Sequence, residues 1–285
     1  MNLAWWVLPP YNLYWGTNHL LPQFCFGKST VLTVHDLLIL KHPDDQPYPQ
    51  YYAQRFVSSL RRADRIVAIS KTTASDLIDL FPWTKDKITI ALQGYEQSLL
   101  PRKDLKTIRE RFPYPYVVML GGHRPRKNLA LGIEAVALLQ KQGVPIRILL
   151  TGDVHGCFQP LLQQYPDAVQ RTGMLTRGEL AALLIYSQAL LSPSLYEGFG
   201  LPLLEAMAAG CPVLALDTPI YREVGSDAAL LVPHDPEGWA NALDRLLHDS
   251  MLRKEHIERG FENLKRFNWD KTAEVYSKTF HQLLN

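Results

Sequence analysis

Short apolar runs alternate along this chain with amphipathic stretches of helical period, almost from one end to the other. A short apolar run bounded by turn residues fits a buried strand, and apolar residues three or four positions apart fit one face of a helix. Regular alternation of the two is typical of βαβ units built around a parallel sheet. The pattern therefore predicts an α/β fold.

The first part of the chain contains a short series of such elements. The expected strands are residues 30–35, 65–69 and 87–91, and the expected helices are residues 50–62 and 70–80. Ser70 is predicted to cap the second helix, because a serine hydroxyl can accept a hydrogen bond from an unpaired N–H of the first turn. Residues 92–101 lack a clear period and are interpreted as a connector, and residues 102–111 are predicted to form a helix.

A longer series follows. Its expected strands are residues 116–120, 146–150, 168–171, 189–191, 213–216 and 228–231. Its expected helices are residues 128–142, 177–186, 202–209, 236–248, 252–265 and 270–284. This second series is long enough for a complete doubly wound domain, whereas the first is short for one.

Composition narrows the class of protein. A length of 285 residues suits one large or two ordinary domains, and 47% hydrophobic with 20% charged residues is typical of a globular protein. The net charge of +2 is too small to indicate nucleic-acid binding. The three cysteines, Cys25, Cys157 and Cys211, are scattered, so no disulfide framework is expected and a cytoplasmic location is predicted.

The strongest candidate for chemistry is the segment 194–210. It carries two glutamates, Glu197 and Glu205, with seven residues between them, around a glycine-containing loop that leads into a helix expected to begin at Pro202. The first N–H groups of such a helix are unpaired and suit an anionic group, and Gly198 and Gly200 let the backbone approach a ligand closely. An ionised carboxylate suits hydroxyl groups. A diphosphate flanked by diols, as in a nucleotide sugar, fits this combination.

Three loops rich in glycine and charge follow predicted strands of the second series, namely residues 121–127, 151–153 and 192–200. Ligands of open parallel sheets bind beyond the carboxyl ends of the strands, so these loops are expected to meet. Arg126 and Lys127 in the first loop would offset the charge of a diphosphate. The chain contains no Asp-x-Asp pair for a divalent cation, and because the two cations can take over that task, no metal and no cofactor are expected.

The segment 194–210, with the Arg-Lys-Asn string at residues 126–128, resembles the donor site of the family 4 retaining glycosyltransferases, which have the two-domain GT-B fold. The resemblance implies two doubly wound Rossmann-like domains with an interdomain cleft, the first of them incomplete here. It divides the chain into a truncated acceptor-side domain at residues 1–100, a nucleotide-sugar-binding domain at residues 113–268, and a last helix at residues 269–285 that crosses back to the first domain.

The resemblance also implies roles for individual residues. Glu197, Arg126, Lys127 and His35 would be catalytic, and the remaining donor-binding residues would be Glu205, Gly122, Gly198, Phe199, Gly200, Leu201 and Leu175. His35 ends a predicted strand, and relatives place a histidine there near the transferred sugar or the acceptor. A histidine that only caps backbone groups is the open alternative.

The resulting hypothesis is a retaining hexosyltransferase that moves mannose or a similar sugar from a GDP-, UDP- or dTDP-hexose to a saccharide or lipid-linked saccharide acceptor in surface polysaccharide synthesis. A lipid-linked acceptor would place the protein at the inner face of the membrane, where Lys254, Arg259, Lys265 and Arg266 could form a basic face. The rival hypothesis is a nucleotide-sugar-binding subunit or truncated paralogue without activity, because the first domain is short.

Overall fold

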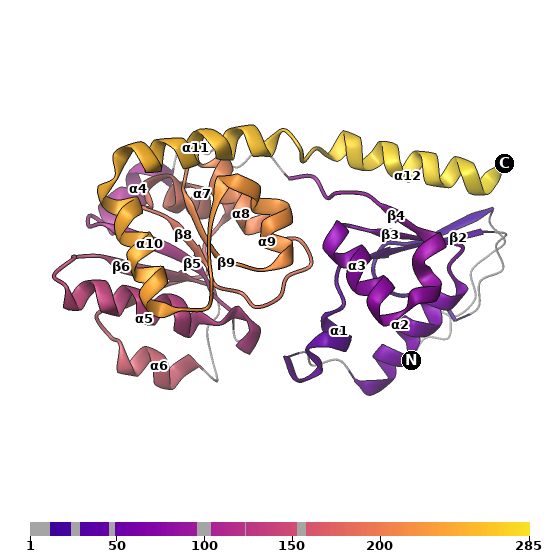
Figure 1. Ribbon diagram of the computed structural model, residues 1–285, viewed down its shortest axis with the longest axis horizontal. Coiled ribbons are helices and arrows are strands. Elements are labelled where there is room, and N and C mark those ends of the chain that lie inside the picture. The colour runs from indigo at the N-terminus through magenta and orange to yellow at the C-terminus, as the bar shows by residue number, and fades with distance from the viewer. Residues whose placement is uncertain (1–11, 24–28, 46–48, 96–103, 123, 153–157) are drawn as a thin grey trace. The chain divides into compact units, whose positions relative to one another are not determined.

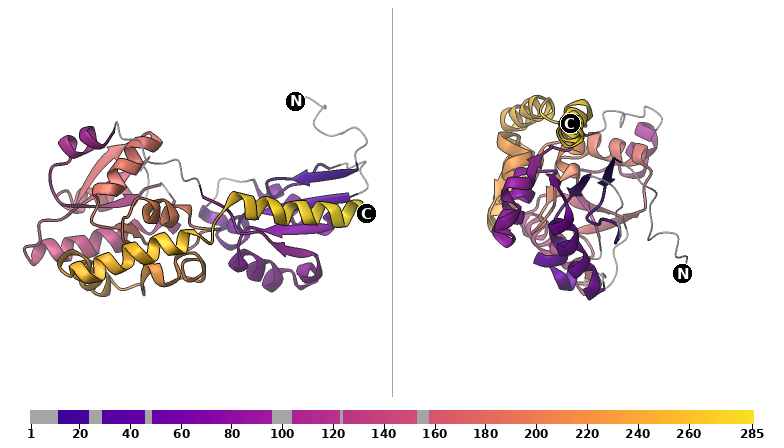
Figure 2. Two further views of the ribbon diagram at one scale, coloured as in Figure 1. Left: turned by 90° about the horizontal axis from the view of Figure 1, so that it is seen from above. Right: turned by 90° about the vertical axis from the view of Figure 1, so that its right-hand side faces the viewer.

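The computed structural model describes residues 12–23, 29–45, 49–95, 104–122, 124–152 and 158–285. The chain divides into two compact units (Figures 1 and 2). Unit 1 comprises Met1–Gly94 and Phe267–Asn285, and unit 2 comprises Tyr95–Arg266. The last helix of the sequence therefore belongs to the same unit as the first strands.

Unit 1 is built on a four-stranded parallel sheet with the strand order β1-β2-β3-β4. The strands are β1 (Leu13–Gly16), β2 (Ser29–Val34), β3 (Arg65–Ala68) and β4 (Ile88–Ile90). The helices are α1 (Leu38–Lys41), α2 (Gln50–Arg62), α3 (Lys71–Leu80) and α12 (Trp269–Leu284), with short 3-10 turns η2 (Pro43–Asp45) and η3 (Pro82–Lys87).

Both faces of the unit 1 sheet carry a core. Leu32 and Val34 of β2 pack in one cluster with Phe56 and Leu60 of α2. Val31, one position along, packs in a second cluster with residues of α12, including Val275, Phe280 and Leu283. Successive side chains of a strand point to opposite faces, so the burial of every residue of β2 follows from helices on both sides of the sheet.

Unit 2 contains a six-stranded parallel sheet with the order β10-β9-β8-β5-β6-β7. The strands are β5 (Tyr116–Leu120), β6 (Arg147–Thr151), β7 (Val169–Gly173), β8 (Leu190–Ser192), β9 (Val213–Leu216) and β10 (Ala229–Val232). The order reverses at β5, whose neighbours are β6 on one side and β8 on the other. The topological switch point of the sheet therefore lies between the neighbouring strands β5 and β8.

Helices cover both faces of this sheet. Those of unit 2 are α4 (Asp104–Arg111), α5 (Leu129–Lys141), α6 (Gln159–Gln164), α7 (Arg177–Tyr186), α8 (Leu201–Ala208), α9 (Pro219–Gly225), α10 (Pro236–His248) and α11 (Ser250–Leu264), with 3-10 turns η4 (Pro125–Lys127) and η6 (Ser226–Ala228). Helices α5 and α10 share one core cluster with the strands. Helices α4, α7, α8 and α11 lie on the other side (Figure 1).

Most elements predicted from the apolar pattern are present, and three predicted helices, α2, α7 and α10, have the predicted bounds. Ser70 caps α3 by accepting a hydrogen bond from the N–H of Thr73, as expected. The sequence pattern did not predict β1, α1, α6 or α9, which are four to seven residues long. Such short elements show too few periods to stand out from a loop.

The helix of the candidate segment begins at Leu201, and the predicted start at Pro202 is wrong by one residue. The reason is Gly200, which takes the N-cap position with a left-handed φ of 97°. Pro202 therefore lies in the second position of the helix, where its missing N–H costs no intrahelical hydrogen bond.

Candidate functional site

The candidate site of unit 2 lies at the carboxyl ends of β5 and β8, at the switch point of the sheet. The loop after β5 leads through Gly122 to Arg126 and Lys127 of η4, and the loop after β8 leads through Glu197 to α8. Open α/β sheets bind ligands at this place. His123 and Asp153, which belong to two of the loops expected to meet, lie outside the described residues.

Two cations and one carboxylate form the centre of the site. The Nζ atom of Lys127 lies 2.7 Å from Oε1 of Glu197, and an Nη atom of Arg126 lies 3.1 Å from the same oxygen. All three side chains are largely buried, with exposed fractions of 12% for Arg126, 21% for Lys127 and 17% for Glu197. The predicted convergence of the two loops is therefore present in the structure as a compact ionic cluster.

Backbone hydrogen bonds hold the two loops together around this cluster. Arg126 donates from its side chain to the carbonyl of Tyr196 at 3.0 Å and accepts at its own carbonyl from the N–H of Leu195 at 2.8 Å. Asn128, in a left-handed conformation with φ 50°, donates from its side chain to the carbonyl of Pro193 at 3.1 Å. Asparagine tolerates this conformation better than most residues. The loops thus meet in a fixed geometry.

The surroundings of Glu197 keep it ionised. Burial alone would raise the pKa of Glu197, but the charges of Lys127 and Arg126 and hydrogen bonds from Lys127 and Ser194 act against burial, and the pKa lies below its ordinary value. A carboxylate that stays ionised can accept hydrogen bonds but cannot donate them.

Glu205 lies in α8 with a half-buried side chain, one turn beyond the start of the helix. Burial raises the pKa of Glu205, and the attraction of Arg177, the first residue of α7, opposes that effect only in part. Among the described residues, Glu205 forms no hydrogen bond or ion pair with another side chain. The two glutamates of the segment therefore differ in environment, one held by two cations and the other set in a less polar position.

The remaining predicted donor-binding residues of unit 2 lie in the same loops or beside them. Gly122 follows β5, and a Cβ atom built on it would lie 3.6 Å from Cγ of Lys127. Phe199 is buried, with an exposed fraction of 4%, and the half-buried Gly198 and Leu201 flank the turn into α8. Leu175 is half-buried in the loop after β7, the outermost strand on its side of the sheet. It shares the edge of the sheet with the ionic cluster without a described contact to it.

His35 belongs to unit 1, directly after β2. The ring Nε2 atom of His35 is 2.9 Å from the carbonyl oxygen of Thr17. The backbone N–H of His35 donates to Nε2 of His19 at 3.1 Å. Burial lowers the pKa of His19, which favours the neutral ring that can accept this bond. His19 therefore has a structural role in holding the backbone at His35.

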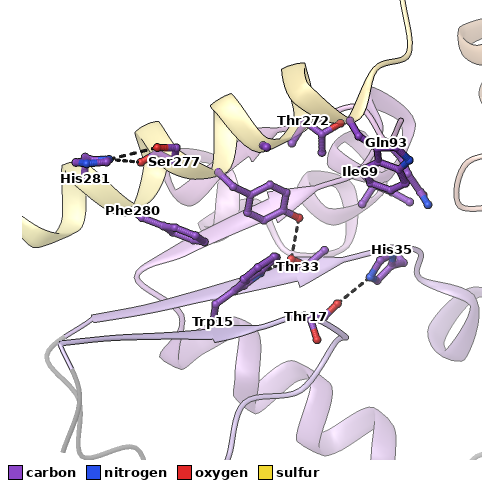
Figure 3. Close-up of a pocket in the computed structure, with 14 residues that line it drawn as sticks. Trp15, Thr17, Thr33, His35, Ile69, Gln93, Thr272, Ser277, Phe280 and His281 are labelled. Atoms are coloured by element: carbon purple, nitrogen blue, oxygen red, sulfur yellow. Dashed lines mark hydrogen bonds between the residues drawn. The ribbon is translucent and has the colours of Figure 1, made fainter. Parts of the chain in front are cut away.

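His35 also lines a cavity of about 520 Å³ inside unit 1 (Figure 3). The aromatic side chains of Trp15, Tyr276 and Phe280 form much of its apolar lining, and their ring centroids are 4.9 to 5.9 Å apart. The hydroxyl of Thr33 accepts from the indole of Trp15 and also hydrogen-bonds the hydroxyl of Tyr276 at 2.8 Å. His35 thus stands among apolar groups in a separate unit from the ionic cluster.

Three of the four cations of the basic face expected near the C-terminus pair with carboxylates of α11. Lys254 pairs with Glu258, Arg259 with Glu255, and Lys265 with Glu262. Arg266 donates to Asn263 and to the carbonyl of Glu223. No helix in the part of the chain that the structure describes is both long enough and apolar enough to span a bilayer.

Sequence reasoning included Asn128 in the Arg-Lys-Asn string without giving it a structural role, and it missed Tyr221 altogether. Asn128 was assigned to the helix that follows it, although an asparagine before an apolar helical pattern is a recognisable signal for a special backbone position. Tyr221 lies in α9, which was not predicted, and its hydroxyl is 2.6 Å from the hydroxyl of Ser192 at the end of β8. Because this contact joins segments that are distant in sequence, no local sequence pattern indicates it.

Comparison with known families adds independent information. The sequence model described as "Glycosyl transferases group 1" matches residues 103–263, and the model described as "Glycosyltransferase Family 4" matches residues 13–98. The chain is 28% identical over 281 residues to the O-antigen chain mannosyltransferase B of Escherichia coli, covering 93% of this chain and 73% of that protein. It is 27% identical to the serotype-specific mannosyltransferase WbdA of Escherichia coli, of which it spans 34%.

Solved structures with the same fold include a sucrose-phosphate synthase from Thermosynechococcus elongatus. It matches with a TM-score of 0.73 and 25% sequence identity, over 92% of this chain and 69% of that one. HepE of Anabaena in complex with UDP and glucose matches with a TM-score of 0.70 and 18% identity, over 90% of this chain and 71% of that one. Both likenesses support an architecture of two Rossmann-like units, the GT-B fold.

Proposed function

This chain belongs to the group 1 glycosyltransferase family, and from that membership we propose that it transfers a hexose from a nucleotide sugar bound in unit 2 to a saccharide acceptor. The names of its relatives as O-antigen mannosyltransferases favour mannose as the sugar and a surface polysaccharide as the product. The donor would be a GDP-, UDP- or dTDP-hexose.

The observation that carries the proposal is the shared oxygen of Glu197, which both Lys127 and Arg126 contact at the switch point of the sheet. Two cations beside one carboxylate leave one net positive charge for the donor diphosphate. Because Glu197 holds both cations in place before a donor arrives, little reorganisation is needed as negative charge builds on the leaving nucleotide.

The glutamates take different parts in this proposal. Glu197 would accept hydrogen bonds from hydroxyls of the transferred sugar, and Glu205 would accept them from the ribose. Glu205 is free of competing side-chain hydrogen bonds in the described structure, so binding a diol would provide the partners that its half-buried carboxylate lacks. The protein mainly positions the donor and stabilises charge, while a phosphate oxygen of the donor would receive the proton of the acceptor.

A membrane-bound acceptor remains compatible with this function. Helix α11 would contribute little to such binding, because its carboxylates pair with Lys254 and Arg259 of the same helix and with Lys265 directly after it. A saccharide acceptor linked to a lipid would have to be recognised through another surface.

The experiment is calorimetry with GDP-mannose, UDP-glucose and dTDP-rhamnose, followed by hydrolysis and transfer assays on the donor that binds. We expect one of the three to bind and to be turned over, and EDTA to leave turnover unchanged because Arg126 and Lys127 meet the diphosphate. Binding without turnover would point to a non-catalytic nucleotide-sugar-binding subunit or an inactive truncated paralogue. Loss of activity in EDTA that manganese restores would contradict the role of the two cations.

A further inference from the structure

Tyr221 connects α9 to the loop that carries Glu197. It is almost fully buried, with an exposed fraction of 1%, and its hydroxyl lies 2.6 Å from the hydroxyl of Ser192. Its ring also supports the turn into α8, since a Cβ atom built on Gly200 would lie 3.1 Å from a ring carbon of Tyr221. One side chain thus contacts both ends of the segment 192–200.

Ser194 completes a path from this tyrosine to the ionic cluster. Its side chain hydrogen-bonds both Tyr221 and Glu197, and it is itself buried with an exposed fraction of 4%. Ser192 is also buried, with an exposed fraction of 9%. Water has little access to any of these hydroxyls, so each depends on the others for its hydrogen bonds.

The chemistry of the acceptor fixes the direction of the hydrogen bonds. An ionised carboxylate has no proton to give, so Ser194 must donate to Glu197. The oxygen of Ser194 is then free to accept from Tyr221, whose own oxygen accepts from Ser192. Burial raises the pKa of the Tyr221 hydroxyl, which therefore keeps its proton and donates.

We propose that Tyr221 is a positioning residue of the donor site, which orients Ser194 and through it the carboxylate of Glu197 toward Lys127 and Arg126. The inference rests on the proposed function of the same site. In the described structure, the titratable and charged groups that face Glu197 are Lys127 and Arg126 from η4 and Tyr221 from α9. A tyrosine remote in sequence would thereby set the acidity of the group that holds the sugar.

The test compares Tyr221→Phe with Tyr116→Phe. Tyr116 is also buried, with an exposed fraction of 2%, and its hydroxyl donates to the carbonyl of Leu183 at 3.0 Å at the other end of the sheet. Both variants keep the ring and remove a buried hydroxyl, which hydrogen-bonds Ser192 and Ser194 in the case of Tyr221 and the carbonyl of Leu183 in the case of Tyr116. We expect kcat to fall about tenfold in Tyr221→Phe alone, and the acid limb of the kcat/KM profile to move to higher pH, because Glu197 loses an oriented donor.

Ser194→Ala provides a second arm that does not depend on the folding of Tyr221→Phe. The acid limb of the kcat/KM profile of Ser194→Ala should also move to higher pH. The double variant Ser194→Ala with Tyr221→Phe should show the same position of that limb as Ser194→Ala alone. Equal pH profiles for Tyr221→Phe and Tyr116→Phe, or independent effects of Ser194→Ala and Tyr221→Phe, would overturn the proposal.

Thermal unfolding separates this inference from the proposed function. If the wild type binds and turns over no nucleotide sugar, the proposed function fails, whereas the midpoint shifts of Tyr221→Phe and Glu197→Gln still report on their connection. We expect the double variant to shift less than the sum of the single variants, and Tyr116→Phe with Glu197→Gln to shift by their sum. Additivity in both pairs would refute the connection.

Discussion

The two glutamates of the segment 194–210, Glu197 and Glu205, have pKa values shifted in opposite directions. The pKa of Glu197 is lowered because its two cations outweigh the effect of burial, whereas burial dominates at Glu205 and raises its pKa. The spacing of the two residues could be recognised in the sequence, but this difference could not. It arises from Lys127, which contacts Glu197 across a sequence separation of 70 residues.

Lys127→Ala should lower kcat/KM by about 10²- to 10³-fold, because a cation held ready for the diphosphate contributes mostly in the transition state. Steady-state kinetics with the donor identified by calorimetry would measure the effect. Lys141→Ala, at the exposed end of α5, is the control for loss of a lysine in the same unit. Turnover by Lys127→Ala within about threefold of wild type would contradict the assignment.

Glu205→Gln should stabilise the protein at neutral pH while weakening donor binding. The raised pKa means that the folded state binds more protons than the unfolded state between the two pKa values, so stability falls as pH rises through that window above about 4.5. The substitution removes this penalty, and the thermal midpoint should rise at pH 7 but not well below pH 4.5.

Calorimetry on the same Glu205→Gln variant should show donor affinity reduced about tenfold, because an amide is a weaker partner for ribose hydroxyls than a carboxylate. Glu274→Gln, on the exposed face of α12, is the control. An unchanged midpoint at both pH values would disprove the pKa argument.

At the scale of elements, the turn into α8 depends on Gly200 for two reasons, its left-handed φ of 97° and the closeness of the Tyr221 ring. Gly143 has a similar φ of 88°, but a Cβ atom there meets nothing within 4 Å. Gly143→Ala should lower the free energy of unfolding by about 1 kcal/mol, and Gly200→Ala by about 2 kcal/mol or more. Equal losses of unfolding free energy in the two variants, measured by denaturant unfolding, would show that the contact of the new Cβ atom with the Tyr221 ring does not destabilise the protein.

Elements with clear end signals could be predicted to the residue. Helix α7 has a capping box of Thr176 and Glu179, and α10 is capped by Asp235 and begins at Pro236. Helix α9 lacks a side-chain cap and is seven residues long, so its sequence resembles a loop. The part of the site that it supplies, Tyr221, was missed for the same reason.

At the scale of the whole molecule, α12 supplies the second core of unit 1 although it follows unit 2 in the sequence. A chain ending at Arg266 should lose the unfolding transition of unit 1 or show it at a lower temperature, because Val275, Phe280 and Leu283 no longer cover Val31 and its neighbours. Differential scanning calorimetry would measure both units. Retention of the unit 1 transition at its original temperature would contradict this role of α12.

The placement of α12 also has a consequence for biosynthesis. Proteins are made from the amino end, and domains usually fold in the order in which they emerge from the ribosome. Here the sheet of unit 1 is translated before unit 2, whereas its covering helix α12 is translated after unit 2, so unit 2 can fold while the sheet of unit 1 still lacks that helix. During that interval the nascent chain exposes an uncovered apolar face of the unit 1 sheet, and we expect translation pauses or chaperones to matter most before α12 has left the exit tunnel.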